Sequence, residues 1–297
     1  MKRIILAGGS GFVGSALAPV LRGKGYEPIV LGRGLTDLQW DGRTVGPWAS
    51  ALEGAEAVVN LTGKNINCRP TEENRREILQ SRVNSVRALG EAIRQCAVPP
   101  NTFVQASGVG YYGETGDRVA DEDSPPGGDF PAEVCREWER AFYELELPTT
   151  RKVVLRLGVV LGRDGGALPM LEELTRWFLG GAVGNGRQFI SWIHLADIVR
   201  MFVSAIEQRE LSGDFNACSP EPVTNAEFMR ELRHAVHRPW SPPVPAPFAR
   251  AGAWLMGTDG DLALTSCRCV PRQSLDHGFD FQFPNLRDAF ADLYPKQ

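Results

Sequence analysis

Residues 1–17 read MKRIILAGGSGFVGSAL. The apolar run Arg3–Ala7 leads into a glycine-rich turn between Gly8 and Gly14, and a helical pattern starts at Phe12. Amides at the start of a helix have no partner within the helix, and the aligned peptide dipoles favour an anion there. Glycines allow the tight turn and let a phosphate approach the backbone. This stretch therefore predicts a strand, a turn and a helix that hold the pyrophosphate of a dinucleotide.

The second predicted strand, Pro28–Leu31, indicates which dinucleotide is bound. NAD sites usually carry an Asp or Glu about 20 residues after the glycines, where it accepts hydrogen bonds from ribose hydroxyls. Arg33 occupies that place here, and Asp37 lies beyond the expected strand end. A guanidinium pairs with a 2′-phosphate, whereas a carboxylate repels it. We therefore expect NADP(H) rather than NAD(H). A P-loop would need Lys-Ser/Thr after the glycines, which Gly14-Ser15 does not supply.

Short apolar runs alternate with longer helical patterns in the first half of the chain, which is typical of βαβ units. Most of the expected strands are continuous apolar runs, as strands covered on both faces are. They are Arg3–Ala7, Pro28–Leu31, Ala57–Leu61, Thr102–Ala106 and Lys152–Leu157, with helices expected at Phe12–Arg22, Glu72–Gln95 and Ala132–Glu146. The sequence thus predicts an α/β fold: a Rossmann-type doubly wound, mostly parallel sheet with a smaller C-terminal α/β lobe.

The pattern changes after residue 160. We predict a dinucleotide-binding domain over 1–160 with later segments returning to it, a substrate-side lobe over 161–240 and a C-terminal segment over 245–297. The later helices are expected at Leu168–Leu179, Leu195–Gln208 and Phe248–Leu255, and after the caps Thr224 and Asn285; the later strands are expected at Phe189–Ile193, Asp214–Ala217 and Phe279–Phe283. The five prolines of Pro239–Pro247 predict a stiff connector without regular structure.

Composition excludes several classes of function. The 297 residues carry a net charge of −4 without a long like-charge block, so nothing supports a nucleic-acid-binding face. No apolar run approaches the roughly 20 residues that span a bilayer. The six cysteines are scattered, without C-x-x-C pairs or metal-ligand spacing to histidine. We therefore expect a cytoplasmic protein with free thiols, no metal, and no nucleic-acid or membrane partner.

Several motifs together resemble the extended short-chain dehydrogenases/reductases. They are Gly8-x-x-Gly11-x-x-Gly14, the run from Ala106 to Gly113 (ASGVGYYG), and Trp192 to Asp197 (WIHLAD). Asn60 to Gly63 (NLTG), Ser81-Arg82-Val83 and Arg156 to Gly162 (RLGVVLG) narrow the resemblance to the atypical epimerase-like subfamily, whose members carry a short C-terminal domain of unknown function. The resemblance covers nearly the whole chain. It implies NADP(H) as the cofactor and a small-molecule substrate that the resemblance does not identify. It also allows a homodimer that forms through a pair of helices.

The resemblance also implies roles for individual residues. Between Gly8 and Gly14, the residues Ser10, Gly11, Phe12 and Val13 would cradle the pyrophosphate. Leu61, Thr62 and Gly63 would lie along the adenosine and ribose, and Arg82 would contact cofactor or site water. Ala106 and Ser107 would end a strand beneath the nicotinamide, which Leu157, Gly158 and Val159 would flank. His194 is expected to tie its strand to a neighbour, with Asp197 capping the next helix.

The catalytic pair of the superfamily is missing. Its members use Tyr-x-x-x-Lys, in which the lysine lowers the tyrosine pKa so that the tyrosine exchanges a proton with the substrate. No tyrosine of this chain is followed four residues later by lysine, and the lysine position falls at Cys135. Three groups are candidates to replace the tyrosine: Ser107, Tyr111, and a Cys135 of lowered pKa. Each also has a purely structural explanation. For Ser107 it is a hydrogen bond at the strand end, for Tyr111 it is packing within a loop, and for Cys135 it is the filling of a small buried space.

Three functions remain open. The first is an NADP(H)-dependent oxidoreductase acting on a small carbonyl, enone or related substrate. The second is a non-catalytic NADP(H)-binding redox sensor, for which loss of the catalytic pair with an intact cofactor turn is the expected pattern. The third is a nucleotide-sugar epimerase or dehydratase, which rests on fold analogy. The arginine that many nucleotide-sugar members carry before the Ile-His-x-x-Asp run is replaced by Ile190 or Ser191, which disfavours the third.

Overall fold

Seven parallel strands form the central sheet of the computed structural model, which describes residues 1–295. They are β1 (Lys2–Ala7), β2 (Tyr26–Gly32), β3 (Leu38–Gln39), β4 (Ala57–Asn60), β5 (Thr102–Gly108), β6 (Arg151–Leu157) and β10 (Gly213–Ala217). Their order across the sheet is β10-β6-β5-β4-β1-β2-β3. The chain therefore reverses its direction of winding between β1 and β4. Doubly wound sheets bind ligands at the carboxyl ends of the strands beside such a reversal.

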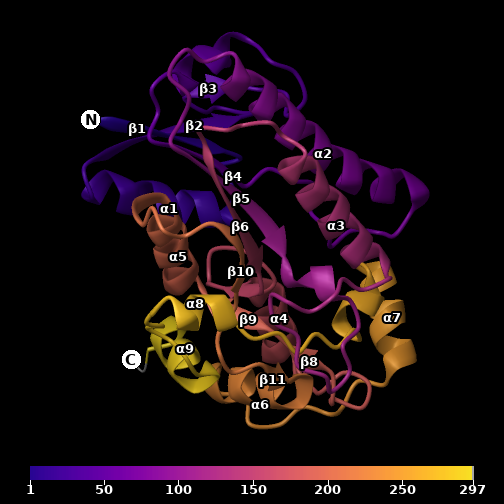
Figure 1. Ribbon diagram of the computed structural model, residues 1–297. Coiled ribbons are helices and arrows are strands. Elements are labelled where there is room, and N and C mark those ends of the chain that lie inside the picture. Colours follow the sequence, from indigo (N-terminus) through magenta and orange to yellow (C-terminus); the bar gives the residue numbers. More distant parts are fainter. Residues whose placement is uncertain (296–297) are drawn as a thin grey trace.

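Helices cover both faces of the sheet (Figure 1). On one face α1 (Phe12–Gly23) packs against α5 (Leu195–Glu207), and on the other α2 (Glu72–Arg94) packs against α3 (Phe130–Tyr143). Burial on both sides explains why β4 and the second half of β1 are entirely buried and apolar apart from Asn60. The predicted fold class is confirmed. Because α5 and β10 pack into this unit, the later chain returns to it.

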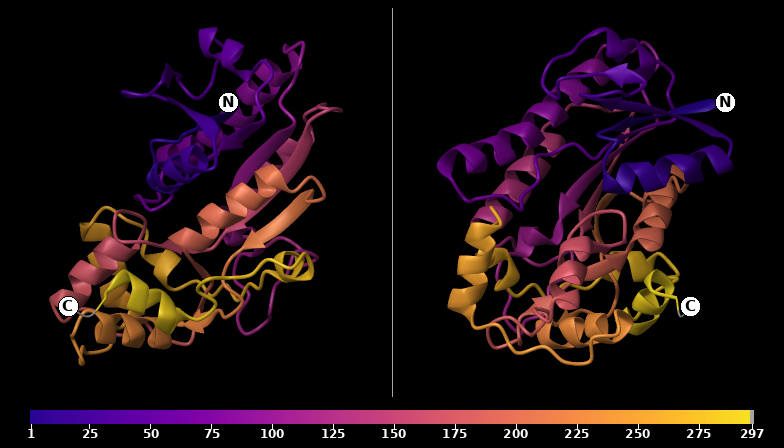
Figure 2. Two further views of the ribbon diagram at one scale, coloured as in Figure 1. Left: turned by 90° about the vertical axis from the view of Figure 1, so that its left-hand side faces the viewer. Right: turned by 180° about the vertical axis from the view of Figure 1, so that it is seen from behind.

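A smaller lobe lies beyond the carboxyl ends of the strands, and Figure 2 shows it beneath the sheet from two further sides. Its helices and those of the C-terminal segment are α4 (Leu168–Arg176), α6 (Asn225–Ala235), α7 (Ala246–Leu255), α8 (Arg272–Asp276) and α9 (Leu286–Leu293). Its short strands are β7 (Val159–Leu161), β8 (Phe189–Ile190), β9 (Trp192–His194) and β11 (Val223–Thr224). Three 3₁₀ helices complete the elements of the described residues: η1 (Pro47–Leu52), η2 (Val109–Tyr112) and η3 (Gly260–Ala263). Thr224 and Asn285 cap α6 and α9 as the sequence predicts.

The strand expected at Phe279–Phe283 does not form. Its backbone amides at Gln282 and Phe283 donate to the carboxylate of Asp197 on α5, at 2.9 Å each, instead of pairing with a strand. The alternating aromatic pattern still buries side chains, since Phe281 and Phe283 are buried. The prediction of a strand is therefore wrong, because the acceptor of these amides is a side chain.

Three further boundaries differ from the sequence expectation. The strand expected at Phe189–Ile193 divides into β8 and β9, which pair with different strands on either side of Ser191. The helix predicted to reach Leu179 ends at Arg176. The proline connector is shorter than expected because α7 begins at Ala246, and its Pro247 lies in the first helical turn, where proline needs no amide partner.

Candidate functional site

The glycine turn is tightly enclosed on its inner side. Gly8 has φ +76°, and a Cβ there would lie 3.0 Å from the backbone of Leu61 and Thr62. A Cβ at Gly14 would lie 2.5 Å from Gly9 Cα, within the closest approach of α1 to the turn. Side chains at these positions would push α1 away from the sheet. The turn therefore needs glycine for the reasons that make such turns phosphate-binding elements.

The start of α1 is free to receive an anion. Its N-cap, Gly11, has an extended backbone and no side chain, so no capping group occupies the first amides, and no acidic residue lies in the first turn. The ring of Phe12 packs beneath a loop of the second lobe, where a Cβ at Gly165 would lie 2.6 Å from it. The side chain of Ser10 lies beside Gly32 at the end of β2. These contacts place Ser10, Gly11, Phe12 and Val13 at the carboxyl edge of the sheet.

The end of β2 carries one available cation and one occupied carboxylate. Arg33 is exposed and has no hydrogen bond or ion pair with any other residue of the range 1–295. The nearby carboxylate of Asp37 accepts a 2.8 Å hydrogen bond from the backbone amide of Val30. Asp37 therefore acts as a local structural acceptor, whereas Arg33 is free to pair with a phosphate next to Ser10.

The loop after β4 has a buried polar atom without a partner. The hydroxyl of Thr62 is buried and has no hydrogen bond within the described part of the chain. Buried polar atoms are rarely left unpaired in folded proteins, so this hydroxyl fits a site completed by a ligand. The guanidinium of Arg82 lies over Gly63, where a Cβ would come within 3.1 Å of its Cζ. Its Nη1 donates to the carbonyls of Lys64 and Ile78, at 2.9 and 3.0 Å.

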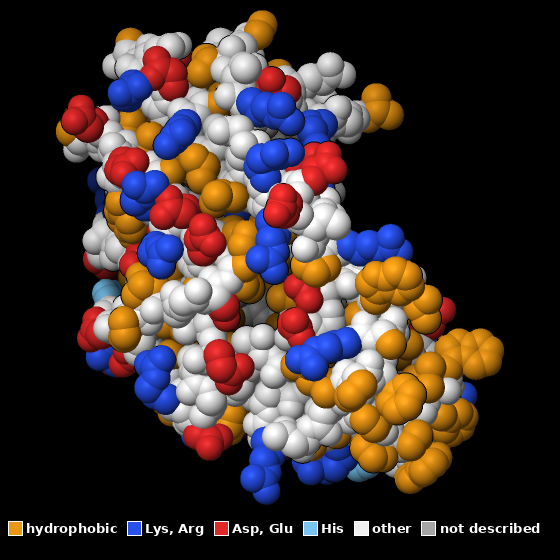
Figure 3. All heavy atoms as spheres, turned by 90° about the vertical axis from the view of Figure 1, so that its right-hand side faces the viewer, with side chains coloured by type: hydrophobic (Ala, Val, Ile, Leu, Met, Phe, Trp, Pro, Cys, Tyr) orange, Lys and Arg blue, Asp and Glu red, His pale blue; other side chains and the backbone are white. Residues whose placement is uncertain are grey.

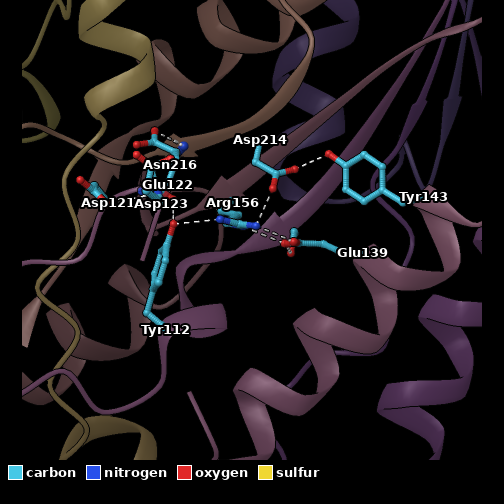
Figure 4. A network of polar contacts seen from close by, with 10 residues as sticks. Tyr112, Asp121, Glu122, Asp123, Glu139, Tyr143, Arg156, Asp214 and Asn216 are labelled. Carbon is cyan, nitrogen blue, oxygen red and sulfur yellow. Dashed lines mark hydrogen bonds and ion pairs between the residues drawn. The ribbon is translucent and has the colours of Figure 1, made fainter. Parts of the chain in front are cut away.

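The end of β5 is fixed by a buried network of charges (Figure 4). The Ser107 hydroxyl donates to Glu139 of α3 at 2.6 Å, and the same carboxylate forms two hydrogen bonds with the guanidinium of Arg156 on β6, at 3.0 and 2.8 Å. Burial lowers the pKa of Arg156, but the hydrogen bonds and charge of Glu139 outweigh it and raise the pKa above its ordinary value. Arg156 is therefore a permanent buried cation.

The network continues from Arg156 to the edge strand of the sheet. Its Nη2 bonds Asp214 of β10 at 2.7 Å, and its Nη1 donates to the hydroxyl of Tyr112 at 3.0 Å. That hydroxyl donates in turn to Asn216 at 2.8 Å, and the hydroxyl of Tyr143 donates to Asp214. Figure 4 shows these side chains converging on Arg156 from η2, α3, β6 and β10. Every oxygen in this set is engaged, so the network fixes the floor of the site.

Tyr111 differs from its neighbour in having a free hydroxyl. Its ring lies over Arg156, with 3.8 Å between the guanidinium carbon and the ring centroid, and is half-buried. Burial raises the pKa of the Tyr111 phenol, so it stays protonated at neutral pH. Unlike the hydroxyl of Tyr112, that of Tyr111 has no hydrogen-bond partner among residues 1–295. It is therefore an available proton donor.

Cys135 does not have the lowered pKa that its position in α3 suggested. The side chain is buried beside Gly108, where a Cβ would lie 3.7 Å from its Sγ. Burial, with a smaller contribution from the charge of Glu139, raises the pKa of the thiol to about 11. Reactive cysteines need the thiolate, which this environment disfavours. The expectation of an activated thiol is wrong, and Cys135 is a buried filler.

The segment Leu157–Val159 joins the sheet to the second lobe. A Cβ at Gly158 would lie 2.8 Å from the carbonyl oxygen of Ser191, and the amide of Val159 donates to that oxygen at 2.8 Å. On the other side, Ala106 is buried within β5. Because β5 and β6 are parallel to β1 and β4, these residues lie at the same carboxyl edge of the sheet as the glycine turn and the loop after β4.

Ser191 is committed to the C-terminal segment. Its Oγ donates to the carbonyl of Cys267 at 2.8 Å and accepts from the amide of Cys269 at 2.8 Å. The capping expectation for Asp197 is wrong: His194 itself caps α5 through Nδ1, which accepts from the amide of Ala196 at 3.1 Å. Asp197 is buried and binds the backbone of the C-terminal segment instead, so both residues are structural.

The buried network was missed by sequence reasoning, although two local signals pointed to it. Arg156 interrupts the apolar run of β6, and Glu139 lies on the buried face of α3. A charged residue in each of two otherwise apolar faces indicates a buried pair, because buried charges are paired.

Within residues 1–295, no helix has both the length and the apolar character needed to cross a membrane.

The strand order and the glycine turn define a dinucleotide-binding protein of the Rossmann class. A model of the NAD dependent epimerase/dehydratase family matches residues 4–218, and one of a domain of unknown function (DUF1731) matches residues 244–293. The chain therefore belongs to the NAD dependent epimerase/dehydratase family, the extended short-chain dehydrogenases/reductases, and carries the additional C-terminal domain.

Similar proteins span the whole chain. The epimerase family protein SDR39U1 of Mus musculus is 37% identical over 98% of this chain and 99% of its own, and the epimerase family protein ML0860 of Mycobacterium leprae is 35% identical over 99% and 97%. The crystal structure of human epimerase family protein SDR39U1 (isoform 2) with NADPH has a TM-score of 0.90 at 33% identity, covering 100% of both chains. That of the nucleoside-diphosphate sugar epimerase from Corynebacterium glutamicum has a TM-score of 0.81 at 32% identity, covering 100% of this chain and 59% of that one.

Proposed function

We propose that this protein is an NADP(H)-dependent oxidoreductase that reduces a small carbonyl, enone or related substrate. The cofactor assignment is supported by the free Arg33, which follows the Gly32 that lies beside Ser10, by the occupied carboxylate of Asp37, and by the NADPH in the human structure of similar fold. The free thiols of all six cysteines support a reducing, cytoplasmic location as part of the proposal.

The residues present fit the cofactor. The amides at the start of α1 would hold the pyrophosphate, Arg33 the 2′-phosphate, and the unpaired Thr62 hydroxyl and Arg82 the ribose side. Bound NADPH would supply a hydride. The residues of the chain would then orient the substrate at the carboxyl end of β5 and provide a proton at the phenol oxygen of Tyr111.

The free hydroxyl of Tyr111 is the observation that carries this proposal. Of the three candidate groups, Ser107 already donates its proton to Glu139, and Cys135 is a buried thiol of raised pKa. Tyr111 alone combines partial exposure with an uncommitted hydroxyl above a fixed cation. Among the nearby charges, Arg156 favours the negative charge that would develop on the Tyr111 oxygen, as the lysine of the usual pair does, whereas Glu139 and Asp214 oppose it.

Turnover by Tyr111→Phe tests the assignment. We expect oxidation of NADPH with a panel of aldehydes, ketones and activated alkenes, and a loss of about 100-fold or more in kcat when the phenol is removed. NADPH affinity should be unchanged. Tyr26→Phe, at the start of β2, is the matched control and should keep full activity. Equal turnover by Tyr111→Phe and the natural protein would contradict the role of Tyr111.

A non-catalytic redox sensor is the second candidate. The position of the superfamily's catalytic lysine is occupied by Cys135, a buried thiol of raised pKa that cannot replace the lysine. Stoichiometric NADPH binding with no turnover on any compound of the panel would favour it.

Nucleotide-sugar epimerisation is less well supported, because Ser191 is committed to Cys267 and Cys269 at the place where nucleotide-sugar members carry arginine. If UDP-glucose competed for the candidate substrate site, that result would support nucleotide-sugar epimerisation instead.

A further inference from the structure

Exposed hydrophobic side chains are concentrated on one face of the second lobe. Trp177–Leu179, Trp240, Phe248 and Trp254–Met256 supply eight of the seventeen large hydrophobic residues that are exposed within residues 1–295. We call this surface the aromatic face. Figure 3 shows a large group of hydrophobic side chains at one corner of the molecule. The others are scattered, as single exposed hydrophobic residues normally are.

Direct contacts join the segments of the aromatic face. The guanidinium of Arg238 lies 5.4 Å from the ring centroid of Phe178, and its Nε donates to the carbonyl of Arg176 at 3.2 Å. The connector before α7 pairs with the chain after α4, since Val183 and Val244 form an isolated bridge. The end of α4, the connector and α7 therefore form a continuous surface.

The aromatic face is larger than an isolated protein normally exposes. Each of its residues is between 48% and 74% exposed. With side chains of this size, the exposed apolar area is roughly 1,000 Å². The largest apolar patch of a typical monomer is about 300–600 Å². One partner contributes about 800 Å² to a stable protein–protein interface. The area thus matches what one subunit brings to a stable dimer.

Phe178 is held in a strained backbone conformation on this face. Its φ is +60°, which is a genuine outlier for a bulky side chain. Such strain is costly and persists where the surroundings impose it. The strained turn after α4 keeps the ring half-exposed instead of letting it fold into the core. The backbone conformation therefore fixes the exposure of the Phe178 ring.

The charged rim has the composition of a protein interface. Arg176 pairs with Glu172 at 2.7 Å, Arg250 pairs with Asp261 at 2.7 Å, and Arg238 lies against Phe178. No lysine occurs between residues 153 and 295. Arginine and aromatic residues are enriched in protein interfaces and lysine is depleted. A rim of both signs can also face a copy of itself, whereas an anionic membrane would select a purely basic one.

The helix pair that the family resemblance suggested for dimerisation lacks such a face. None of the exposed large hydrophobic residues in the described chain lies on α2, and α3 has only Tyr143 at its end. The outward positions of both helices are charged, including Arg87 and Arg140. An interface between two copies has its apolar core on the second lobe instead.

We propose that the aromatic face is the interface of a homodimer, in which the same face of a second copy covers it through a two-fold axis. The end of α4, the proline connector and α7 of each subunit supply the contacts. Trp240 and Phe248 form the central anchors, because both are largely exposed and neither ring stacks on another of the residues 1–295.

Sedimentation equilibrium of the full chain tests the proposal. We expect the natural protein to have twice its 32.6 kDa chain mass at micromolar concentration. The double variant Trp240→Glu, Phe248→Glu should weaken association by about 100-fold or more, because each change buries charge at the centre of the interface. Leu35→Glu places the same charge at an exposed hydrophobic position elsewhere and should remain a dimer, as should Arg87→Glu on α2.

Hydrogen exchange on the natural protein gives an answer that does not depend on any variant folding. Amides of the connector and α7 should be protected increasingly as concentration rises, while those on the outer face of α2 should not. Three results would overturn the proposal: a natural protein that is monomeric at every concentration, dissociation by Arg87→Glu instead of by the double variant, or binding of the monomer to phosphatidylcholine–phosphatidylglycerol vesicles through this face.

Discussion

The hydroxyl of Ser107 and the carboxylate of Glu139 lie 2.6 Å apart, and the same carboxylate neutralises the buried guanidinium of Arg156. Ser107 is the penultimate residue of β5, Glu139 lies on α3, and Arg156 belongs to β6. One carboxylate therefore joins two strands and a helix directly beneath the candidate substrate position. The network keeps the floor of the site rigid and holds the paired guanidinium of Arg156 against the ring of Tyr111.

Glu139→Gln should lower the free energy of unfolding by about 3 kcal/mol, because it leaves Arg156 buried with only one of its two carboxylate partners. Urea unfolding monitored by circular dichroism measures the change. Glu137→Gln on the exposed side of the same helix is the control and should change stability by less than about 0.5 kcal/mol. Equal effects of the two substitutions would mean that the network contributes little.

Gly14→Ala should destabilise the fold by about 1–3 kcal/mol, because its Cβ would lie 2.5 Å from Gly9 Cα. Gly23→Ala, at the other end of the same helix, has no atom within 4 Å of the new methyl. It should raise stability by about 0.5 kcal/mol through helix propensity and a less flexible unfolded chain. Thermal unfolding of both variants distinguishes close approach from a general effect of glycine; a stable Gly14→Ala would refute the close-packing argument.

Arg33→Ala should weaken NADPH binding about 10- to 100-fold, as expected for loss of a charge-assisted pair with the 2′-phosphate. NADH, which lacks that phosphate, should bind the variant and the natural protein equally. Calorimetric titration with both cofactors provides the comparison, and Arg22→Ala on the exposed side of α1 is the matched control. If Arg33→Ala affects the two cofactors equally, the cofactor preference resides elsewhere.

The stability of the protein should fall as pH drops below about 6.5, partly because of His194. Burial lowers the pKa of His194 in the folded state, although the charges of Asp292 and Asp197 raise it in part. The unfolded chain therefore binds the proton more readily, and protonation of Nδ1 would break the cap on α5. The contribution of His194 is complete above its unfolded pKa and is lost as pH falls through the folded one.

Replacement of this histidine isolates its contribution to the pH dependence. His194→Asn retains a capping acceptor but does not titrate, so the slope of unfolding free energy against pH should be shallower between pH 5 and about 6.5. His277→Asn, an exposed position, should leave the slope as in the natural protein. Identical slopes for all three proteins would show that other groups dominate this range.

Short-range features could be predicted from the sequence. The glycine turn, the alternation of strands and helices, and the caps Thr224 and Asn285 depend on residues close together in the chain. The aromatic residues at Phe279–Phe283 led to a wrong prediction of a strand, because their pattern does not specify a hydrogen-bond partner. That partner, Asp197, lies more than 80 residues earlier, so only the folded chain reveals it.

The candidate site could also be predicted only in part, because its decisive contacts join residues that are far apart in the sequence. Tyr111 and Cys135 could be selected from their places in the motifs, but not distinguished. Their difference arises from burial and from Arg156, which is brought beneath Tyr111 only when β6 pairs with β5. The network members Tyr112 and Asn216 are 104 positions apart. No local pattern encodes such a pair, although the isolated charges within apolar faces mark its ends.

The bonds from Gln282 and Phe283 to Asp197 have a consequence for synthesis of the protein. Until residue 283 has left the ribosome, α5 carries a carboxylate that is destined for full burial but has no backbone donors to receive it. Domains usually fold one after another as the chain emerges. Here Asp197 can pair with Arg200 of its own helix, but it receives its two backbone donors only when the C-terminal segment arrives, so we expect α5 to complete its packing late in synthesis.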